Sequence, residues 1–301
     1  MTRMETAVDT RAQAAQLDAL LQPLDWSEPD PRARAFRFDA PSGVLAAWSI
    51  GDPANPRVVL VPGATGSKED FLLLAPPLVE AGYFVQSYDL AGQYESAGAG
   101  PSRTSGRWDY PLYLADFIAF LESGEPAHVL GYSFAGILAQ LALAGRPELF
   151  LSLTLLTSPP LTGNVFRGVK IVGPFARFAT PHAGAGLMIW GIQTNKNGVD
   201  ERRLDFVRAR LAVTRRESVD DIIALMMNTP DVTAAVAGAG VPILVATGQH
   251  DLWPVRLHAE YADRIGAELA VYRTGHSPCE TTPNQLALDM ITTFRRAEQL
   301  A

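Results

Sequence analysis

The stretch VLGYSFAGILAQLALA, Val129–Ala144, decides the fold of this chain. It begins as an apolar run typical of a buried strand and continues, directly after Ser133, as an apolar run with helical spacing. A strand that turns so sharply into a helix holds the corner residue in a strained conformation, with its side chain at the carboxyl edge of the sheet. Ligands of open α/β sheets bind at this edge. Small residues at Gly131, Ala135 and Gly136 permit the close backbone approach that the corner needs, so Ser133 is a candidate nucleophile.

Strand-like and helix-like runs alternate on both sides of this corner. Apolar, β-rich runs predict strands at residues 57–63, 83–90, 127–133, 151–159, 241–251 and 267–275, after a hairpin over 34–50. Runs with helical periodicity follow them, at residues 67–82, 110–123, 135–145, 254–266 and 283–299. This alternation predicts an α/β fold with a mostly parallel, twisted sheet and helices on both faces.

The alternation lapses in one long segment, which predicts an inserted helical cap or lid over residues 160–231. The core domain then comprises residues 36–159 and 232–301, and residues 1–35 form an N-terminal helical extension. We expect this extension to pack on the core, with a dimer contact or a flap over the substrate as alternatives. The arginines of residues 200–218 are expected to form a solvated helix face.

Composition limits the classes of function. The 301 residues are 48% hydrophobic and 19% charged, which suits an ordered chain with a large core. The formal net charge of -7, without a basic face rich in aromatic residues, argues against nucleic acid as a partner. The single cysteine, Cys279, cannot form an internal disulfide, and this fits a reducing compartment. Without a secretory signal or an apolar run long enough for a bilayer, we expect a soluble cytoplasmic monomer or homodimer with no membrane partner.

Ser133 needs a base, because a serine hydroxyl is a weak nucleophile until its proton is accepted. Two later strand runs end in suitable residues: ILVATGQHD leads to Asp251, and ELAVYRTGH leads to His276. The order serine, acid, histidine, each at the end of a successive strand, is that of the α/β-hydrolase template.

From about residue 36 to its end, the chain resembles α/β-hydrolase-fold serine enzymes with a cap domain. GYSFAG, from Gly131, resembles the nucleophile elbow of the family, and DLAGQYES, from Asp89, resembles its glycine-rich turn. TGQHDLWP, from Thr247, resembles the acid loop, and TGHSPCETTP, from Thr274, resembles the histidine loop. Two positions depart from the family pattern: Ala135 replaces the second glycine of the elbow, and Pro62 replaces a common histidine.

The resemblance implies a role for each site residue. Ser133 would be the nucleophile, His276 the general base and Asp251 the residue that orients the imidazole. The backbone N–H groups of Ala64 and Phe134 would form the oxyanion hole. The implied reaction is hydrolysis of an ester, a lactone or a thioester through an acyl-enzyme.

The expected cap suggests the nature of the substrate. Its segment 164–192 is apolar and aromatic, which favours an apolar acyl or alcohol part, although packing within the cap explains the same residues. We expect Thr65, His182, Trp190 and Trp253 to line the pocket.

Other functions stay open at this point. The same triad serves acyltransferases, perhydrolases and C–C bond hydrolases, and the fold also serves as a non-catalytic ligand-binding module. No histidine–carboxylate set has metal-ligand spacing and no G-x-G-x-x-G follows a strand, so we expect neither a metal nor a cofactor. His258, in the middle of an expected helix, receives no role.

Overall fold

A single sheet organises the molecule. The computed structural model describes residues 3–101, 106–169, 180–194 and 200–300. Within these residues the sheet has eight strands in the order β1-β2-β4-β3-β5-β6-β7-β8. The strands are β1 Arg34–Ala40, β2 Gly43–Ile50, β3 Arg57–Val61, β4 Phe84–Tyr88, β5 Ala127–Tyr132, β6 Phe150–Leu156, β7 Ile243–Gly248 and β8 Glu268–Tyr272. The β1–β2 and β2–β4 pairs are antiparallel and the other pairs are parallel, which confirms the predicted α/β fold.

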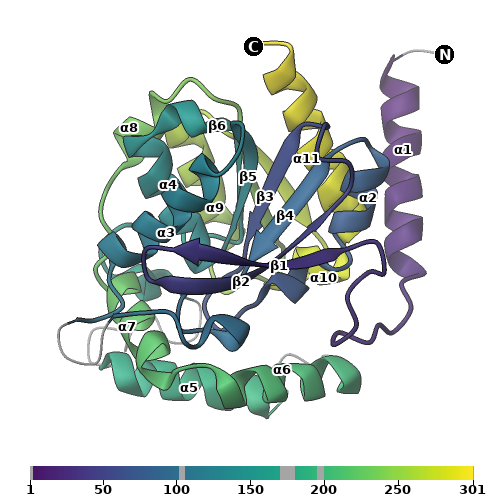
Figure 1. The fold of residues 1–301 in the computed structure, drawn as a ribbon. Coiled ribbons are helices and arrows are strands. Elements are labelled where there is room, and N and C mark those ends of the chain that lie inside the picture. The colour runs from purple at the N-terminus through teal and green to yellow at the C-terminus, as the bar shows by residue number, and fades with distance from the viewer. Residues whose placement is uncertain (1–2, 102–105, 170–179, 195–199, 301) are drawn as a thin grey trace.

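Helices cover both faces of this sheet (Figure 1). They are α1 Arg3–Ala19, α2 Ala75–Glu80, α3 Tyr110–Glu122, α4 Phe134–Gly145, α5 Pro181–Gln193, α6 Glu201–Val213, α7 Arg216–Met226, α8 Thr233–Ala237, α9 Val255–Ile265, α10 Pro278–Thr281 and α11 Pro283–Glu298. None of the described helices is long and apolar enough to cross a membrane.

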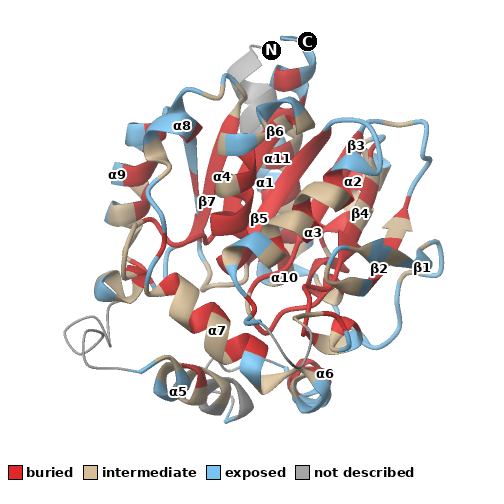
Figure 2. Cartoon of the chain, turned by 60° about the vertical axis from the view of Figure 1, so that its left-hand side comes forward, coloured by how far each residue is buried: buried red, intermediate tan, exposed pale blue. Residues whose placement is uncertain are grey.

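The alternation of side chains along β3 explains the two-sided core. Val59 and Val61 belong to the core formed with α3, α4 and α9, whereas Val58 and Leu60 belong to the core formed with α2 and α11. Successive residues of a strand point to opposite faces, so a parallel strand covered on both sides is apolar throughout. The central strands are accordingly buried, and the helices are exposed only on their outer sides (Figure 2).

The long connection between β6 and β7 contains α5, α6, α7 and α8. In Figure 1, α5 and α6 run beneath the sheet, near α10, which follows the carboxyl end of β8. The part of this connection that contains α5 and α6 therefore lies at the edge at which the parallel strands end, where the sequence places the site residues.

The structure corrects two expectations about helices. The helix expected over residues 67–82 is a 3₁₀ turn, Lys68–Phe71, followed by the short helix α2, which has proline in its first turn. Proline lacks the N–H that would continue a helix from the preceding turn, so the helix has to begin anew there. The expected solvated arginine face is also wrong in part, because Arg203 and Arg210 of α6 are each only 5% exposed.

Candidate active site

Ser133 occupies the corner between β5 and α4. Its φ of 53° and ψ of -116° lie outside the regions that non-glycine residues usually adopt. Its N–H donates to the carbonyl of Leu156 on β6, and its carbonyl accepts from the N–H of Gly136, at 2.9 Å each. Strain of this kind persists only where the surroundings impose it, and it is common at functional sites.

The neighbours of Ser133 show why the corner requires small residues. A Cβ on Gly131 would lie 2.6 Å from the carbonyl oxygen of Ala135, and a Cβ on Gly136 would lie 2.4 Å from Oγ of Ser158. Neither position can carry a side chain without moving the backbone or its neighbour. The methyl group of Ala135 is fully buried, so the departure from the family glycine is accommodated.

The structure brings Ser133, His276 and Asp251 together in a hydrogen-bonded chain. Nε2 of His276 lies 3.2 Å from Oγ of Ser133, and Nδ1 of His276 lies 2.5 Å from Oδ1 of Asp251. A carboxylate that accepts the Nδ1 hydrogen leaves Nε2 of a neutral imidazole free to accept the serine proton. The arrangement can therefore activate the hydroxyl of Ser133.

Backbone contact between the two loops fixes the distance from Asp251 to His276. A Cβ on Gly248, at the end of β7, would lie 1.9 Å from the carbonyl oxygen of Gly275. The N–H of His250 also donates to the carbonyl of Thr274, at 2.9 Å. Only glycine permits this approach, so the glycine at position 248 is part of the geometry of the site.

Asp251 is a buried anion, with an exposed fraction of 1%. Burial of the carboxylate by itself would raise its pKa, but the adjacent His276 and His258 hold the pKa below the ordinary value. Asp251 is consequently ionised throughout the neutral range and can stabilise a positive charge that develops on His276.

Sequence reasoning missed His258. Its Nε2 lies 2.9 Å from Oδ2 of Asp251, and both side chains are buried. His258 lies on α9, on a buried stripe with Tyr261, Ala262 and Ile265. That stripe was the available signal, because an imidazole on an apolar helix face needs a polar partner.

The histidine loop is supported by two further residues, Thr157 and Tyr132, which the sequence did not indicate. Thr157, with a φ of 42°, donates its hydroxyl to the carbonyl of His276 at 3.0 Å. The hydroxyls of Tyr132 and Ser277 are 2.9 Å apart, and the ring of Tyr132 lies 5.5 Å from the imidazole of His276.

The loop after β3 lies beside the nucleophile. A Cβ on Gly63 would lie 2.9 Å from Cβ of Ser133. The N–H of Gly66 donates to the carbonyl of Gly63 at 3.0 Å, and this closes a turn that contains Ala64. Phe134 is the first residue of α4, so its N–H has no partner within its own helix.

The residues expected to line a pocket fall into different places. Trp253 is buried beside the imidazole of His276, with ring centroids 6.2 Å apart, and its Nε1 donates to the carbonyl of Val165 at 2.9 Å. Thr65 is buried in the turn after β3, where its hydroxyl donates to the carbonyl of Ala64 at 2.6 Å. The side chain of His182 is instead 77% exposed and pairs with Asp220, so we leave it out of the site.

Trp190 lies on α5, but its side chain is outside the described residues. Among the residues that the structure does describe, no group of three or more His, Cys, Asp or Glu side chains could hold a metal ion. Cys279 is fully buried in α10, and burial raises the pKa of its thiol.

Comparison with known proteins identifies the family and supports the fold. The model of the alpha/beta hydrolase family matches residues 58–289, most of the chain. The chain belongs to this family. No curated protein matches this alpha/beta hydrolase.

Solved structures resemble this alpha/beta hydrolase along most of its length. A carboxylesterase of Nitrososphaera gargenis has 17% identity and a TM-score of 0.70, covering 88% of this chain and 100% of its own. The epoxide hydrolase VrEH1 of Vigna radiata has 14% identity and a TM-score of 0.72, covering 89% and 100%. The meta-cleavage product hydrolase of Pseudomonas fluorescens has 15% identity and a TM-score of 0.66, covering 87% and 98%. At such identities the likeness shows the fold alone.

Proposed function

We propose that this alpha/beta hydrolase is a serine hydrolase that cleaves an ester, a lactone or a thioester of an apolar small molecule. The observation that carries the proposal is the chain from Ser133 through His276 to Asp251, with the serine at a strained corner. A carboxylesterase, an epoxide hydrolase and a meta-cleavage product hydrolase share the fold, so the fold alone does not determine the reaction. The serine nucleophile and its base favour acyl transfer to water.

The distances within the chain of side chains support the following mechanism. Ser133 attacks the substrate carbonyl while His276, 3.2 Å away, accepts the hydroxyl proton at Nε2. Asp251 stabilises the resulting imidazolium through Nδ1. The N–H groups of Ala64 and Phe134 donate to the oxyanion, and the imidazolium then protonates the leaving alcohol or thiol. Water, activated by the same histidine, releases the acid product and restores the serine.

The segment 160–231, which contains α5, α6 and α7, is the proposed cap over this reaction. Trp253, beside His276, donates to the backbone of Val165, where this connection begins. An apolar wall at this place suits an apolar acyl or alcohol group. A cytoplasmic location and a monomeric or homodimeric state stay predictions of the sequence.

The test combines covalent labelling with turnover. We expect a fluorophosphonate probe to label the wild type, and a series of p-nitrophenyl esters of increasing chain length to be hydrolysed. Ser133→Ala should abolish labelling and lower kcat by about 10⁴- to 10⁶-fold. Ser27→Ala, at an exposed serine of the N-terminal region, is the matched control and should behave as the wild type.

The outcomes separate the proposal from its alternatives. A folded wild-type protein that the probe does not label would contradict the proposal and favour a ligand-binding role. A labelled protein that leaves esters intact, yet cleaves a diketone or transfers the acyl group to an alcohol or peroxide, would point to the other reactions of the same triad. Full activity in Ser133→Ala would exclude Ser133 as the nucleophile.

A further inference from the structure

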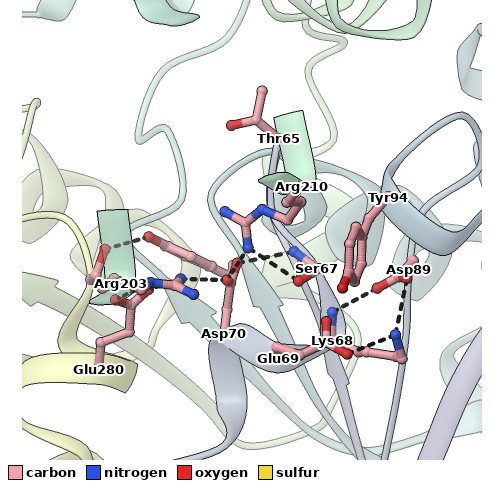
Figure 3. Close-up of polar contacts among 12 residues, drawn as sticks. Thr65, Ser67, Lys68, Glu69, Asp70, Asp89, Tyr94, Arg203, Arg210 and Glu280 are labelled. Carbon is pink, nitrogen blue, oxygen red and sulfur yellow. Dashed lines mark hydrogen bonds and ion pairs between the residues drawn. The ribbon is translucent and has the colours of Figure 1, made fainter. Parts of the chain in front are cut away.

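A buried cluster of charges joins α6 to both loops of the proposed site. Two arginines of α6, Arg203 and Arg210, point toward Asp70, which follows the loop after β3, and Arg203 also points toward Glu280 on α10 (Figure 3). Arg203, Arg210 and Asp70 are buried, and the side chain of Glu280 is largely so. We call these four residues the α6 charge cluster.

Short contacts hold the cluster together. Arg203 meets Glu280 as a fork, with Nε 3.0 Å from Oε2 and Nη2 2.6 Å from Oε1. Nη2 of Arg203 is also 2.6 Å from Oδ1 of Asp70, and Nη1 of Arg210 is 2.5 Å from the same oxygen. Nη1 of Arg210 further donates to Oγ of Ser67 at 3.1 Å. Two cations face two carboxylates, so the charges balance within the cluster.

Asp70 connects the cluster to the turn that contains Ala64. While Oδ1 faces the arginines, Oδ2 accepts the N–H of Ser67 at 3.2 Å. The same Oδ2 would lie 2.6 Å from a Cβ on Gly66, so the carboxylate occupies the space of a missing side chain. Gly66 in turn closes the turn by donating to Gly63. A shift of Asp70 would therefore move the proposed oxyanion donor.

Glu280 connects the cluster to the histidine loop. It lies on α10, which begins two residues after His276, and its N–H donates to the carbonyl of Ser277 at 3.1 Å. Because a guanidinium fork fixes both distance and plane, the Arg203 fork fixes α10 against α6. The cluster thus touches both loops that must meet at Ser133.

Stability alone is a weak reason for such a cluster. Four charged groups lose their hydration here, and buried ion pairs are often no more stabilising than apolar residues of similar volume. The cluster does fix the positions of α6, α10 and the turn after β3 relative to one another. Arg203 is also held over the ring of Trp26, at 4.1 Å from its centroid, and near Phe206, at 5.5 Å.

We propose that Arg203 and Arg210 are positioning residues that set the Ala64 turn and the His276 loop in register, so that helix α6 of the proposed cap is a fixed part of the catalytic unit. This inference rests on the proposed hydrolase function. It assigns α6 a task beyond covering the substrate: the two arginines keep the oxyanion donor and the general base at matched positions.

The test uses conservative lysine variants. In Arg203→Lys and Arg210→Lys the positive charge stays, but one ammonium cannot reproduce the planar fork or the bridge between Ser67 and Asp70. We expect kcat for a p-nitrophenyl ester to fall about 10-fold or more, since full loss of one oxyanion donor costs about 10²–10³. KM should change less than kcat. Arg202→Lys, at an exposed arginine of the same helix, is the control.

A second readout separates positioning from folding. Phenylboronic acid forms a tetrahedral serine adduct whose oxygen occupies the oxyanion hole. Its inhibition constant should therefore rise in the variants by about the factor by which kcat falls. All variants are assayed well below their melting temperatures. If both lysine variants match Arg202→Lys in kcat and in phenylboronic acid inhibition, the cluster only stabilises the fold and the inference is wrong.

Two milder variants keep the question answerable if the lysine variants do not fold. Ser67→Ala and Glu280→Gln leave both arginines paired with Asp70, and each loosens one arm of the cluster. Both should lower kcat relative to Arg202→Lys, and unchanged kcat in both would overturn the inference. A wild type that is neither labelled nor active would instead count against the proposed function.

Discussion

Asp251 holds two imidazoles at once, one on each oxygen of its carboxylate. Nδ1 of His276 lies 2.5 Å from Oδ1, and Nε2 of His258 lies 2.9 Å from Oδ2. A carboxylate bonded mainly through one oxygen can rotate about its terminal torsion, which is intrinsically broad. The second hydrogen bond restricts this rotation, so His258 helps to fix the direction from which Asp251 meets His276.

His258 should therefore matter for turnover. His258→Leu should lower kcat by about 10- to 100-fold, because a hydrogen bond to a charged group contributes about 1.5–3 kcal/mol. His258→Gln should retain more activity, since its amide can still donate an N–H to Oδ2. Steady-state ester hydrolysis with thermal melting measures both effects. Wild-type kcat in a folded His258→Leu protein would show that the carboxylate is oriented without His258.

The proposed triad could be predicted from the sequence because each member leaves a local signal. Ser133 follows an apolar strand and opens a helix between small residues, while Asp251 and His276 each follow a strand and a glycine. His258 leaves only its place on the buried stripe of α9. The approach of Gly248 to Gly275 is an even weaker signal, because a glycine after a strand is common and the contact is tertiary.

Helices and strands could be predicted where the local sequence pattern determines them. Strands covered on both faces read as continuous apolar runs, so the parallel strands could be predicted. The segment 67–82 was misjudged, because its apolar spacing suits a helix while its prolines force a new start. The burial of Arg203 and Arg210 could not be predicted, since their partners Asp70 and Glu280 lie far away in the sequence.

A buried histidine on β5 should make the strand pair β5–β6 sensitive to acid. Nδ1 of His128 lies 2.8 Å from Oγ of Ser152, and its ring stacks on Phe294 at a centroid distance of 4.1 Å. Burial lowers the pKa of His128 from 6.5 to about 4, although Glu298, 3.4 Å from Nε2, acts in the opposite direction. His128 is therefore neutral in the native protein over a range in which the unfolded chain binds a proton.

The sign of the pH effect follows from this lowered pKa. The contribution of His128 is fully present above pH 6.5 and is lost as the pH falls toward about 4, by about 3 kcal/mol at most. His128→Asn removes the titrating group and should reduce the loss of unfolding free energy between pH 7 and 4.5. Urea unfolding of the wild type and of His128→Asn at the two pH values measures this loss. Equal pH dependence in the two proteins would mean that other groups cause the acid sensitivity.

At the scale of the whole molecule, the N-terminal segment touches two distant parts of the fold. Asp18, near the end of α1, meets the beginning of α11. Trp26 packs on Arg203 of α6, with Leu72, Phe206 and Val207 in the same cluster. The segment thus braces both the sheet-covering helix α11 and the α6 charge cluster. The contact with α11 agrees with the expected packing on the core, whereas the contact with α6 is made with the proposed cap.

The contact of Asp18 with α11 replaces a missing cap. Thr282, the N-cap residue of α11, makes no side-chain cap hydrogen bond, and its hydroxyl donates to the carbonyl of Pro278 instead. Oδ1 of Asp18 accepts the N–H of Asn284 at 2.8 Å, and Oδ2 accepts the N–H of Gln285 at 3.2 Å. These N–H groups belong to the first turn of α11 and have no partner within the helix. The helix dipole also favours a negative charge at this end.

Removing the charge of Asp18 should lower the stability of the protein without affecting catalysis. Asp18→Asn should lower the free energy of unfolding by about 0.5–1 kcal/mol, because the negative charge at the helix N-terminus is lost and the amide nitrogen cannot accept the second N–H. Glu28→Gln removes the same charge from an exposed residue of the N-terminal region, and its stability should stay near that of the wild type. Urea unfolding of the three proteins gives the difference, and kcat should be equal in all of them. If Asp18→Asn were as stable as Glu28→Gln, water would satisfy the first turn of α11 equally well, and α1 would be held by its other contacts, among them the ion pair of Arg11 with Asp289.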